Sequence, residues 1–217
     1  MLLEALRQEV WECNLELPKN RLVTMTSGNV SGRDPETNLV VIKPSGYKYE
    51  QLAPADLVVV DLEGNIIEGH LKPSVDTATH LYLYKHRSDV FGVAHTHSTY
   101  ASVFAVLGES IPPCLTTCAM LGGEIPIGGF VPIGGEEIGR EIVAKIGNAR
   151  AIIMQNHGVF AIGSSASEAT KMAVVVEEVA KITYLAMLRG KPIVLTPEQL
   201  AQTKELYEHR YGQRANL

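Results

Sequence analysis

Apolar residues recur along the chain at two spacings, and the longer spacing predicts helices. Leucines and a valine at near-helical intervals predict a first helix over residues 1–17, which Pro18 ends. The same spacing predicts four later helices, over 74–87, 98–108, 136–147 and 165–190.

Capping residues mark where three helices begin. Ser74 can accept a hydrogen bond from the first turn of the second predicted helix. Ser165 and Glu168 form a capping box before the longest helix. Thr196 and Pro197 open a last helix, because proline fits the first helical position.

Shorter apolar runs, bounded by glycine, proline and aspartate, predict strands between the helices. They cover 22–32, 38–49, 56–70, 89–97, 149–155 and 156–163. Gly28 interrupts the first run, and Glu63-Gly64-Asn65 forms the tip of a hairpin in the third. No linker, repeat or low-complexity segment divides residues 1–217, so we expect one α/β domain.

Composition limits the classes of partner. The chain is 46% hydrophobic and 20% charged, and its net charge of −5 argues against a nucleic-acid partner. No apolar run approaches the ~20 residues that span a bilayer, and the N-terminus does not read as a signal peptide. Cys13, Cys114 and Cys118 form no disulfide framework, and we expect them to be buried. These features predict a cytoplasmic protein.

Three histidines suggest a metal site. His95 and His97 end an apolar run, and side chains two residues apart share one face of a strand. His157 follows another buried strand, and Gly158 allows a sharp turn behind it. Each could also be an ordinary hydrogen-bonded histidine. Together, three neutral imidazoles leave an open position on zinc, which is typical of a catalytic site.

Asp76 and three short turns extend this hypothesis. Asp76 lies in the first turn of a predicted helix, where it could move protons beside a metal or only stabilise the helix. The turns "SGN" (27–29), "KPSG" (43–46) and "KPS" (72–74) offer N–H groups, hydroxyls and lysines. Each motif alone is common in ordinary turns, but their combination predicts a phosphate site.

These motifs together resemble the class II sugar-phosphate aldolase and L-ribulose-5-phosphate 4-epimerase family over nearly the whole chain. The matching stretches are "LPKNRLVTMTSGNVS", "VIKPSGYKYEQL", "EGHLKPSVDTATHLYLY", "VAHTHSTYAS", "NHGVFAIG" and "YGQ". The resemblance implies an α/β fold, a single three-layer α/β/α domain around a mixed, largely antiparallel sheet. It also implies a homotetramer with active sites at the subunit interfaces and a small-molecule sugar phosphate as substrate.

The resemblance further implies a role for each candidate residue. One divalent ion per chain, zinc or alternatively manganese or cobalt, would be held by His95, His97 and His157, with Asp76 against it. Tyr211, in the tail, would be one of two acid/base residues, and Asp76 would be a further catalytic residue. The substrate phosphate would be bound at Gly28, Asn29, Lys43, Ser45, Gly46 and Ser74.

Within this family, the first half of the chain favours the epimerase reaction. Asp76 stands where the aldolases usually have a longer glutamate. We therefore expect conversion of L-ribulose 5-phosphate to D-xylulose 5-phosphate, by retro-aldol and aldol steps through a zinc-stabilised enediolate. Two departures keep an alternative open. Val75 replaces a phosphate-binding serine, and Met120 replaces an acid/base aspartate. The alternative is a class II aldolase that cleaves a ketose 1-phosphate, such as L-fuculose 1-phosphate, to dihydroxyacetone phosphate and an aldehyde.

Two other classes compete with these. Some family members are non-enzymatic interaction modules that have lost metal ligands, whereas this chain keeps all three histidines. A zinc hydrolase would need a glutamate or histidine base beside the metal, and the sequence singles none out.

Overall fold

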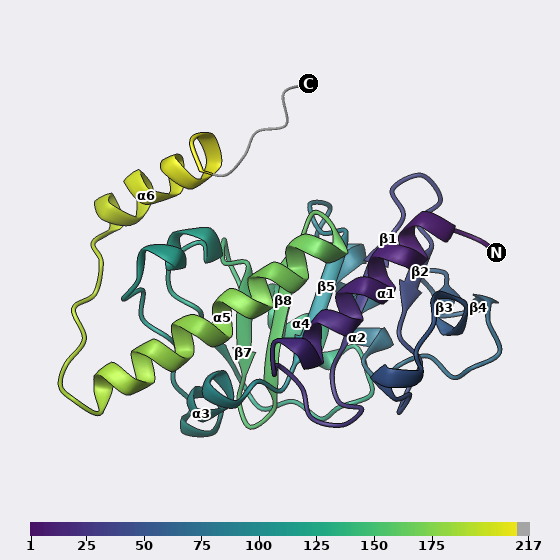
Figure 1. Ribbon diagram of the computed structural model, residues 1–217, viewed down its shortest axis with the longest axis horizontal. Helices are drawn as coiled ribbons and strands as arrows, with labels where there is room; N and C mark the ends of the chain where they lie inside the picture. The colour runs from purple at the N-terminus through teal and green to yellow at the C-terminus, as the bar shows by residue number, and fades with distance from the viewer. Residues whose placement is uncertain (212–217) are drawn as a thin grey trace.

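A single eight-stranded sheet forms the centre of the molecule in the computed structural model, which describes residues 1–211 (Figure 1). The strand order is β4-β3-β2-β1-β5-β8-β7-β6. All neighbouring strands are antiparallel except β6 and β7, which are parallel. The strands are β1 (Asn29–Arg33), β2 (Val40–Ile42), β3 (Val58–Val60), β4 (Ile66–Glu68), β5 (Gly92–Thr96), β6 (Ile127–Gly128), β7 (Ala151–Met154) and β8 (Gly158–Gly163).

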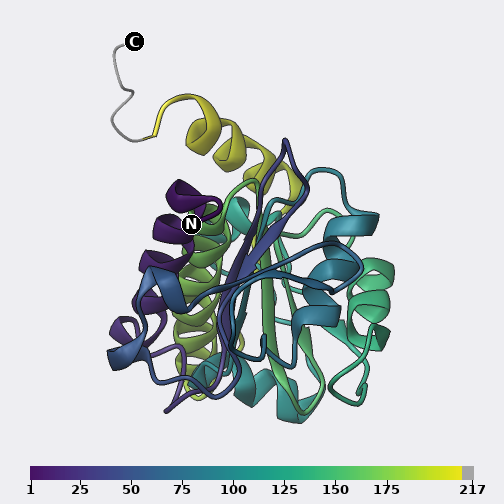
Figure 2. The ribbon, with the colours of Figure 1, turned by 90° about the vertical axis from the view of Figure 1, so that its right-hand side faces the viewer.

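Helices cover both faces of this sheet and make it the middle of three layers (Figure 2). The helices α1, α3 and α5 pack on one face, and α2 and α4 pack on the other. Within residues 1–211 the helices are α1 (Glu4–Lys19), α2 (Thr77–His86), α3 (Thr99–Leu107), α4 (Glu137–Lys145), α5 (Ala166–Met187) and α6 (Pro197–His209). Three short 3₁₀ segments are η1 (Tyr49–Gln51), η2 (Pro54–Asp56) and η3 (Thr116–Leu121). The expected three-layer α/β fold with a mixed, largely antiparallel sheet is confirmed.

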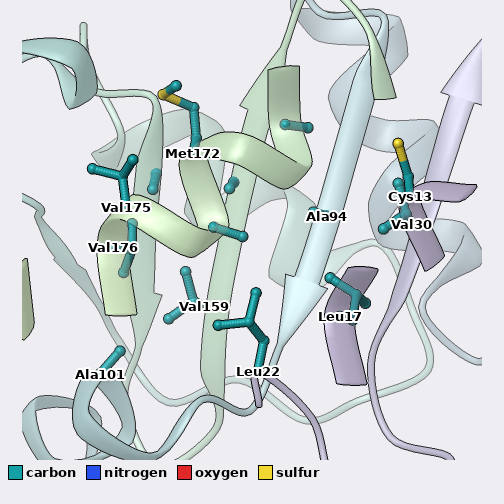
Figure 3. Close-up of a cluster of buried hydrophobic side chains, with 14 of the residues drawn as sticks. Cys13, Leu17, Leu22, Val30, Ala94, Ala101, Val159, Met172, Val175 and Val176 are labelled. Atoms are coloured by element: carbon teal, nitrogen blue, oxygen red, sulfur yellow. The ribbon is translucent and has the colours of Figure 1, made fainter. Parts of the chain in front are cut away.

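The strands have two buried faces, which explains their continuous apolar runs. Successive residues of β5 point into different cores: Ala94 faces α1 and α5, whereas Val93 faces α2 and α4. Figure 3 shows part of the first core, with Val176 on a helix and Ala94 and Val159 on strands of the sheet. This rigid, doubly covered centre positions the candidate site at the ends of β1, β5 and β8.

Two N-terminal predictions were wrong at their boundaries. The first helix continues through Pro18 to Lys19, because a proline in the last turn removes only one N–H group from the helix ladder. The first strand begins at Asn29 instead of residue 22. Met25 and Gly28 have φ angles of 56° and 75°, which extended backbone does not tolerate.

Two later helices also differ from their predicted bounds. The helix predicted from Ser74 begins at Thr77, because the backbone carbonyl of Ser74 accepts the Thr77 N–H while its hydroxyl lies 3.0 Å from Asn29 Nδ2. The long helix α5 ends at Met187, three residues before Gly190.

The predicted capping of α5 and α6 is largely present. Ser165 Oγ accepts the Glu168 N–H at 3.1 Å, as expected, but the Glu168 carboxylate accepts the N–H of Ser164 instead of completing the capping box. A full capping box joins Thr196 and Gln199 at the start of α6.

The structure bears on two predictions made from composition, concerning membrane-spanning helices and the three cysteines. None of the helices within residues 1–211 has both the length and the apolar character needed to cross a bilayer. The three cysteines are free thiols; Cys13 and Cys118 are buried, whereas Cys114 is only partly so.

Candidate metal centre and phosphate pocket

Three imidazoles converge where β5 and β8 lie side by side. His95 is in β5, His97 follows the end of that strand, and His157 lies in the turn before β8. Their potential ligand atoms all lie within 4.8 Å of one another, and the Nε2 atoms of His95 and His97 are 3.0 Å apart. Nitrogens on a tetrahedral zinc at 2.0–2.1 Å lie roughly 3.3 Å apart. The spacing of these atoms is therefore close to that of a metal-ligand set.

The hydrogen bonds of the three histidines leave imidazole nitrogens free to bind a metal. His95 Nδ1 lies 2.9 Å from the carbonyl oxygen of Val159. A carbonyl can only accept, so Nδ1 carries the proton and Nε2 keeps its lone pair. His157 Nδ1 is buried without a hydrogen-bond partner among the described residues. Burial also lowers the pKa of all three imidazoles, which favours the neutral form that binds metals. These residues fit a divalent ion.

Asp76 lies directly before α2 and next to the three histidines. Its Oδ2 accepts a hydrogen bond from Asn29 Nδ2 at 2.8 Å, and Ser74 Oγ lies 3.4 Å away. Asn29 is the residue of β1 that pairs with His95 across the ladder. Burial opposes ionisation of Asp76, but the nearby His95 and His80 and the Asn29 hydrogen bond outweigh it, so its pKa is lowered. The carboxylate is therefore held charged beside the imidazoles.

The two lysine-proline-serine turns join next to Asp76. An isolated β-bridge pairs Pro44 with Pro73. The Ser45 N–H donates to the carbonyl of Lys72 at 2.9 Å, and the Ser74 N–H donates to that of Lys43 at 3.1 Å. Segments about thirty residues apart thus form one wall of the site.

The turn that contains Gly28 forms another wall. The Tyr49 hydroxyl lies 2.8 Å and 2.9 Å from the carbonyl oxygens of Ser27 and Gly28. Gly28 has a positive φ, and a Cβ atom there would lie 2.8 Å from the carbonyl oxygen of His95. The turn therefore packs directly on the strand that carries a candidate metal ligand.

Lys43 supplies a buried cation to this wall. Its Nζ donates to the carbonyl of Thr26 at 3.2 Å and lies 4.7 Å from the centre of the Tyr49 ring. Burial lowers the pKa of Lys43 to about 8, although the nearby Asp76 partly opposes this change.

One pocket of about 150 Å³ contains nearly the whole candidate set. Every residue predicted for catalysis, metal or phosphate lines it except Tyr211. The lining residues are Thr26, Ser27, Gly28, Asn29, Lys43, Pro44, Ser45, Gly46, Ser74, Val75, Asp76, His95, His97, Ile133 and His157. Sequence reasoning had not singled out Thr26 or Ile133, because neither lies in the three turns at 27–29, 43–46 and 72–74.

Two residues from the C-terminal half lie elsewhere. Tyr211, the last residue that the structure describes, is 65% exposed beyond α6 and does not line the pocket. The rest of the predicted tail motif lies outside the described residues. Met120, in η3, lines a separate cavity together with Lys204 and Tyr207 of α6.

A buried polar network behind Asp76 was also missed. Its centre is His80, one turn further along α2 and fully buried. Ser31 Oγ lies 2.7 Å from His80 Nδ1 and 2.7 Å from the Tyr84 hydroxyl. Asn29 of β1 thus holds Asp76 directly before α2, and Ser31 contacts His80 and Tyr84 within the helix, which fixes α2 against the sheet. A lone histidine inside a helix gave no signal for this role.

Comparisons with known proteins agree with this fold. The family model described as the class II aldolase and adducin N-terminal domain matches residues 8–184. An L-fuculose 1-phosphate aldolase structure is 31% identical, with a TM-score of 0.90 over 94% of this chain and 96% of that chain. YgbL from Klebsiella pneumoniae is 26% identical, with a TM-score of 0.83 over 94% and 99%. An L-fuculose-1-phosphate aldolase from Thermus thermophilus is also 26% identical, with a TM-score of 0.74 over 86% and 98%.

Proposed function

Because the chain belongs to the class II aldolase and adducin N-terminal domain family, we propose that it is a metal-dependent enzyme acting on phosphorylated ketoses. The reaction breaks the carbon–carbon bond between the α and β carbons of the ketose, one bond removed from the carbonyl carbon. The observation that carries this proposal is the shared pocket, in which three imidazoles and a carboxylate face two joined lysine-proline-serine turns.

Each wall of the pocket has a distinct task. A divalent metal held by His95, His97 and His157, with zinc favoured by three imidazoles, supplies Lewis-acid stabilisation of the charge that develops on the ketose oxygen. The turns at 27–29, 43–46 and 72–74 bind the phosphate through N–H groups and hydroxyls. Asp76, held by Asn29, accepts or returns a proton beside the reacting carbon.

The finer proposal is the epimerase reaction, from L-ribulose 5-phosphate to D-xylulose 5-phosphate. The short Asp76 side chain, tied to Asn29 and Ser74, supports it. In this reaction the aldehyde fragment stays bound, and the carbon–carbon bond re-forms on its other face. A second acid/base group is then needed, and we assign it to Tyr211 of a neighbouring subunit in a homotetramer with sites at its interfaces.

The aldolase reaction is the second candidate. Its support is the likeness to the L-fuculose 1-phosphate aldolase, which extends over nearly the whole of both chains. In this case a ketose 1-phosphate, such as L-fuculose 1-phosphate, yields dihydroxyacetone phosphate and a free aldehyde.

One experiment tests both levels of the proposal. The zinc-loaded protein is incubated with a panel of ketose 1-phosphates and 5-phosphates. NMR measures the formation of the epimer. A coupled assay in which dihydroxyacetone phosphate is reduced measures cleavage. We expect epimer from L-ribulose 5-phosphate; cleavage without epimer would establish the aldolase candidate instead. His97→Ala is the control, and it should remain folded while losing both zinc and turnover. Absence of either product from every substrate would refute the enzyme proposal.

A further inference from the structure

The aromatic ring of Phe160 lies against three histidine rings at once. It stacks on His95, with ring centres 4.1 Å apart and planes 14° from parallel. Its edges meet His157, at 5.9 Å and 73°, and His80, at 6.1 Å and 75°. Phe160 is fully buried and directly opposite His95 in the β5–β8 ladder. Two of its three ring neighbours are thus candidate metal ligands.

We propose that Phe160 is a positioning residue of the metal centre, whose ring fixes the plane of the His95 imidazole. The inference rests on the proposed metal site. The last side-chain torsion of histidine is broad, so its rotamer alone does not aim Nε2 at an ion. A flat ring stacked on one face prevents the imidazole from turning about that torsion.

A second restraint acts on the edge of the same imidazole. The carbonyl of Val159 holds His95 Nδ1 at 2.9 Å and selects the tautomer. Ring stacking and this hydrogen bond constrain different motions, since one limits tilt and the other limits rotation within the ring plane. Residues 157–160 therefore provide a candidate ligand, a carbonyl that sets a tautomer, and a ring that sets a plane.

His80 contacts the Phe160 ring and restrains it. Its ring meets the edge of Phe160, and its Nδ1 is held by Ser31 Oγ at 2.7 Å. The buried network on α2 thereby limits the movement of the Phe160 ring as well as that of the helix.

Zinc affinity of the apoprotein tests the proposal. Phe160→Leu removes the ring, and Phe104→Leu, at a buried position in α3, is the matched control. Competition with a chromogenic chelator gives the zinc Kd, and thermal unfolding of the metal-free protein gives Tm. We expect Phe160→Leu to weaken zinc binding about 10–100-fold, the usual effect of losing support around a ligand. Phe104→Leu should lower Tm without changing the zinc Kd.

A ring-retaining variant separates positioning from general stability. Phe160→Tyr should keep the wild-type zinc Kd even where the added hydroxyl lowers Tm. The inference is overturned if Phe160→Leu binds zinc as wild type does, if Phe160→Tyr loses affinity as Phe160→Leu does, or if Phe104→Leu weakens zinc binding equally. If the wild type and His97→Ala bind zinc alike, the proposed metal site itself is wrong.

Discussion

Among the pocket residues, Lys43 changes charge within an accessible pH range. Burial lowers its pKa to about 8, so its ammonium group is charged below that pH and neutral above it. A sugar phosphate is already dianionic above about pH 7. The attraction between the two is therefore lost as pH rises through 8. We expect the KM for the sugar phosphate to increase between about pH 7 and 9, as initial rates at each pH would show.

The control for Lys43 is a neutral side chain of similar length. Lys43→Gln should have a high KM at every pH and no inflection near pH 8. A Gln variant that keeps the wild-type pH profile would assign the titration to another group.

For single residues, the sequence indicates candidate metal ligands better than it indicates the residues that hold those ligands in place. The spacing of His95 and His97 follows directly from strand alternation, so their shared face could be predicted. Phe160 and His80 occupy apolar or helical patterns that give no hint of function. Their roles arise from ring contacts across the sheet, which local sequence does not encode.

At the scale of elements, the turn at Gly28 should tolerate substitution much less than the turn at Gly46. Both glycines have positive φ angles, which cost a side chain about 1–2 kcal/mol. A Cβ at Gly28 would also lie 2.5 Å from Val23 Cγ1, whereas at Gly46 the described residues leave it open space. We expect Gly46→Ala to lower the free energy of unfolding by about 1 kcal/mol and Gly28→Ala by roughly 2–4 kcal/mol.

Urea unfolding measures this difference, and the two variants serve as each other's controls. Equal losses would show that the packing of the 27–29 turn on β5 contributes little to stability.

Element boundaries show where sequence reasoning fails in this chain. Ser74 has the residue type and position of a helix cap, and its hydroxyl accepts the Asp76 N–H at 3.3 Å, but the same oxygen lies 3.0 Å from Asn29 Nδ2, 45 positions away. The helix starts at Thr77. By contrast, the start of α6 at Thr196 and Pro197 depends only on neighbouring residues, and it was predicted correctly. Local signals are reliable where no distant partner competes for the same atom.

For the whole molecule, the proposed tetramer makes Tyr211 a test of how active sites are shared. Tyr211→Phe should lose about 10²–10⁴ in rate, because it removes a proton donor. His97→Ala is inactive for a different reason. If Tyr211 serves a neighbouring subunit, co-expressed mixtures of these two variants recover about a quarter of the sites, since each variant supplies what the other lacks.

Activity of purified hybrid tetramers, compared with each parent, measures this recovery. No recovery in hybrids of confirmed mixed composition would place both groups in sites within single chains.

The overall architecture was accessible from the sequence only through family resemblance. Alternating helices and strands predicted an α/β domain, but not that β1 pairs with β5 or that β5 pairs with β8. Both pairings join segments more than fifty residues apart; the first places Asn29 opposite His95, and the second brings His157 to His95.

The order of the candidate residues along the chain also has a consequence for how the protein can evolve. The candidate phosphate contacts all precede Val75, the three histidines all follow Val93, and α2 lies between the two stretches. Each stretch is contiguous in the chain, although the two meet in one pocket. A crossover between related genes within α2 would exchange the proposed phosphate-binding turns while leaving the histidines intact. Recognition of the substrate phosphate and choice of the metal can thus change in separate evolutionary steps.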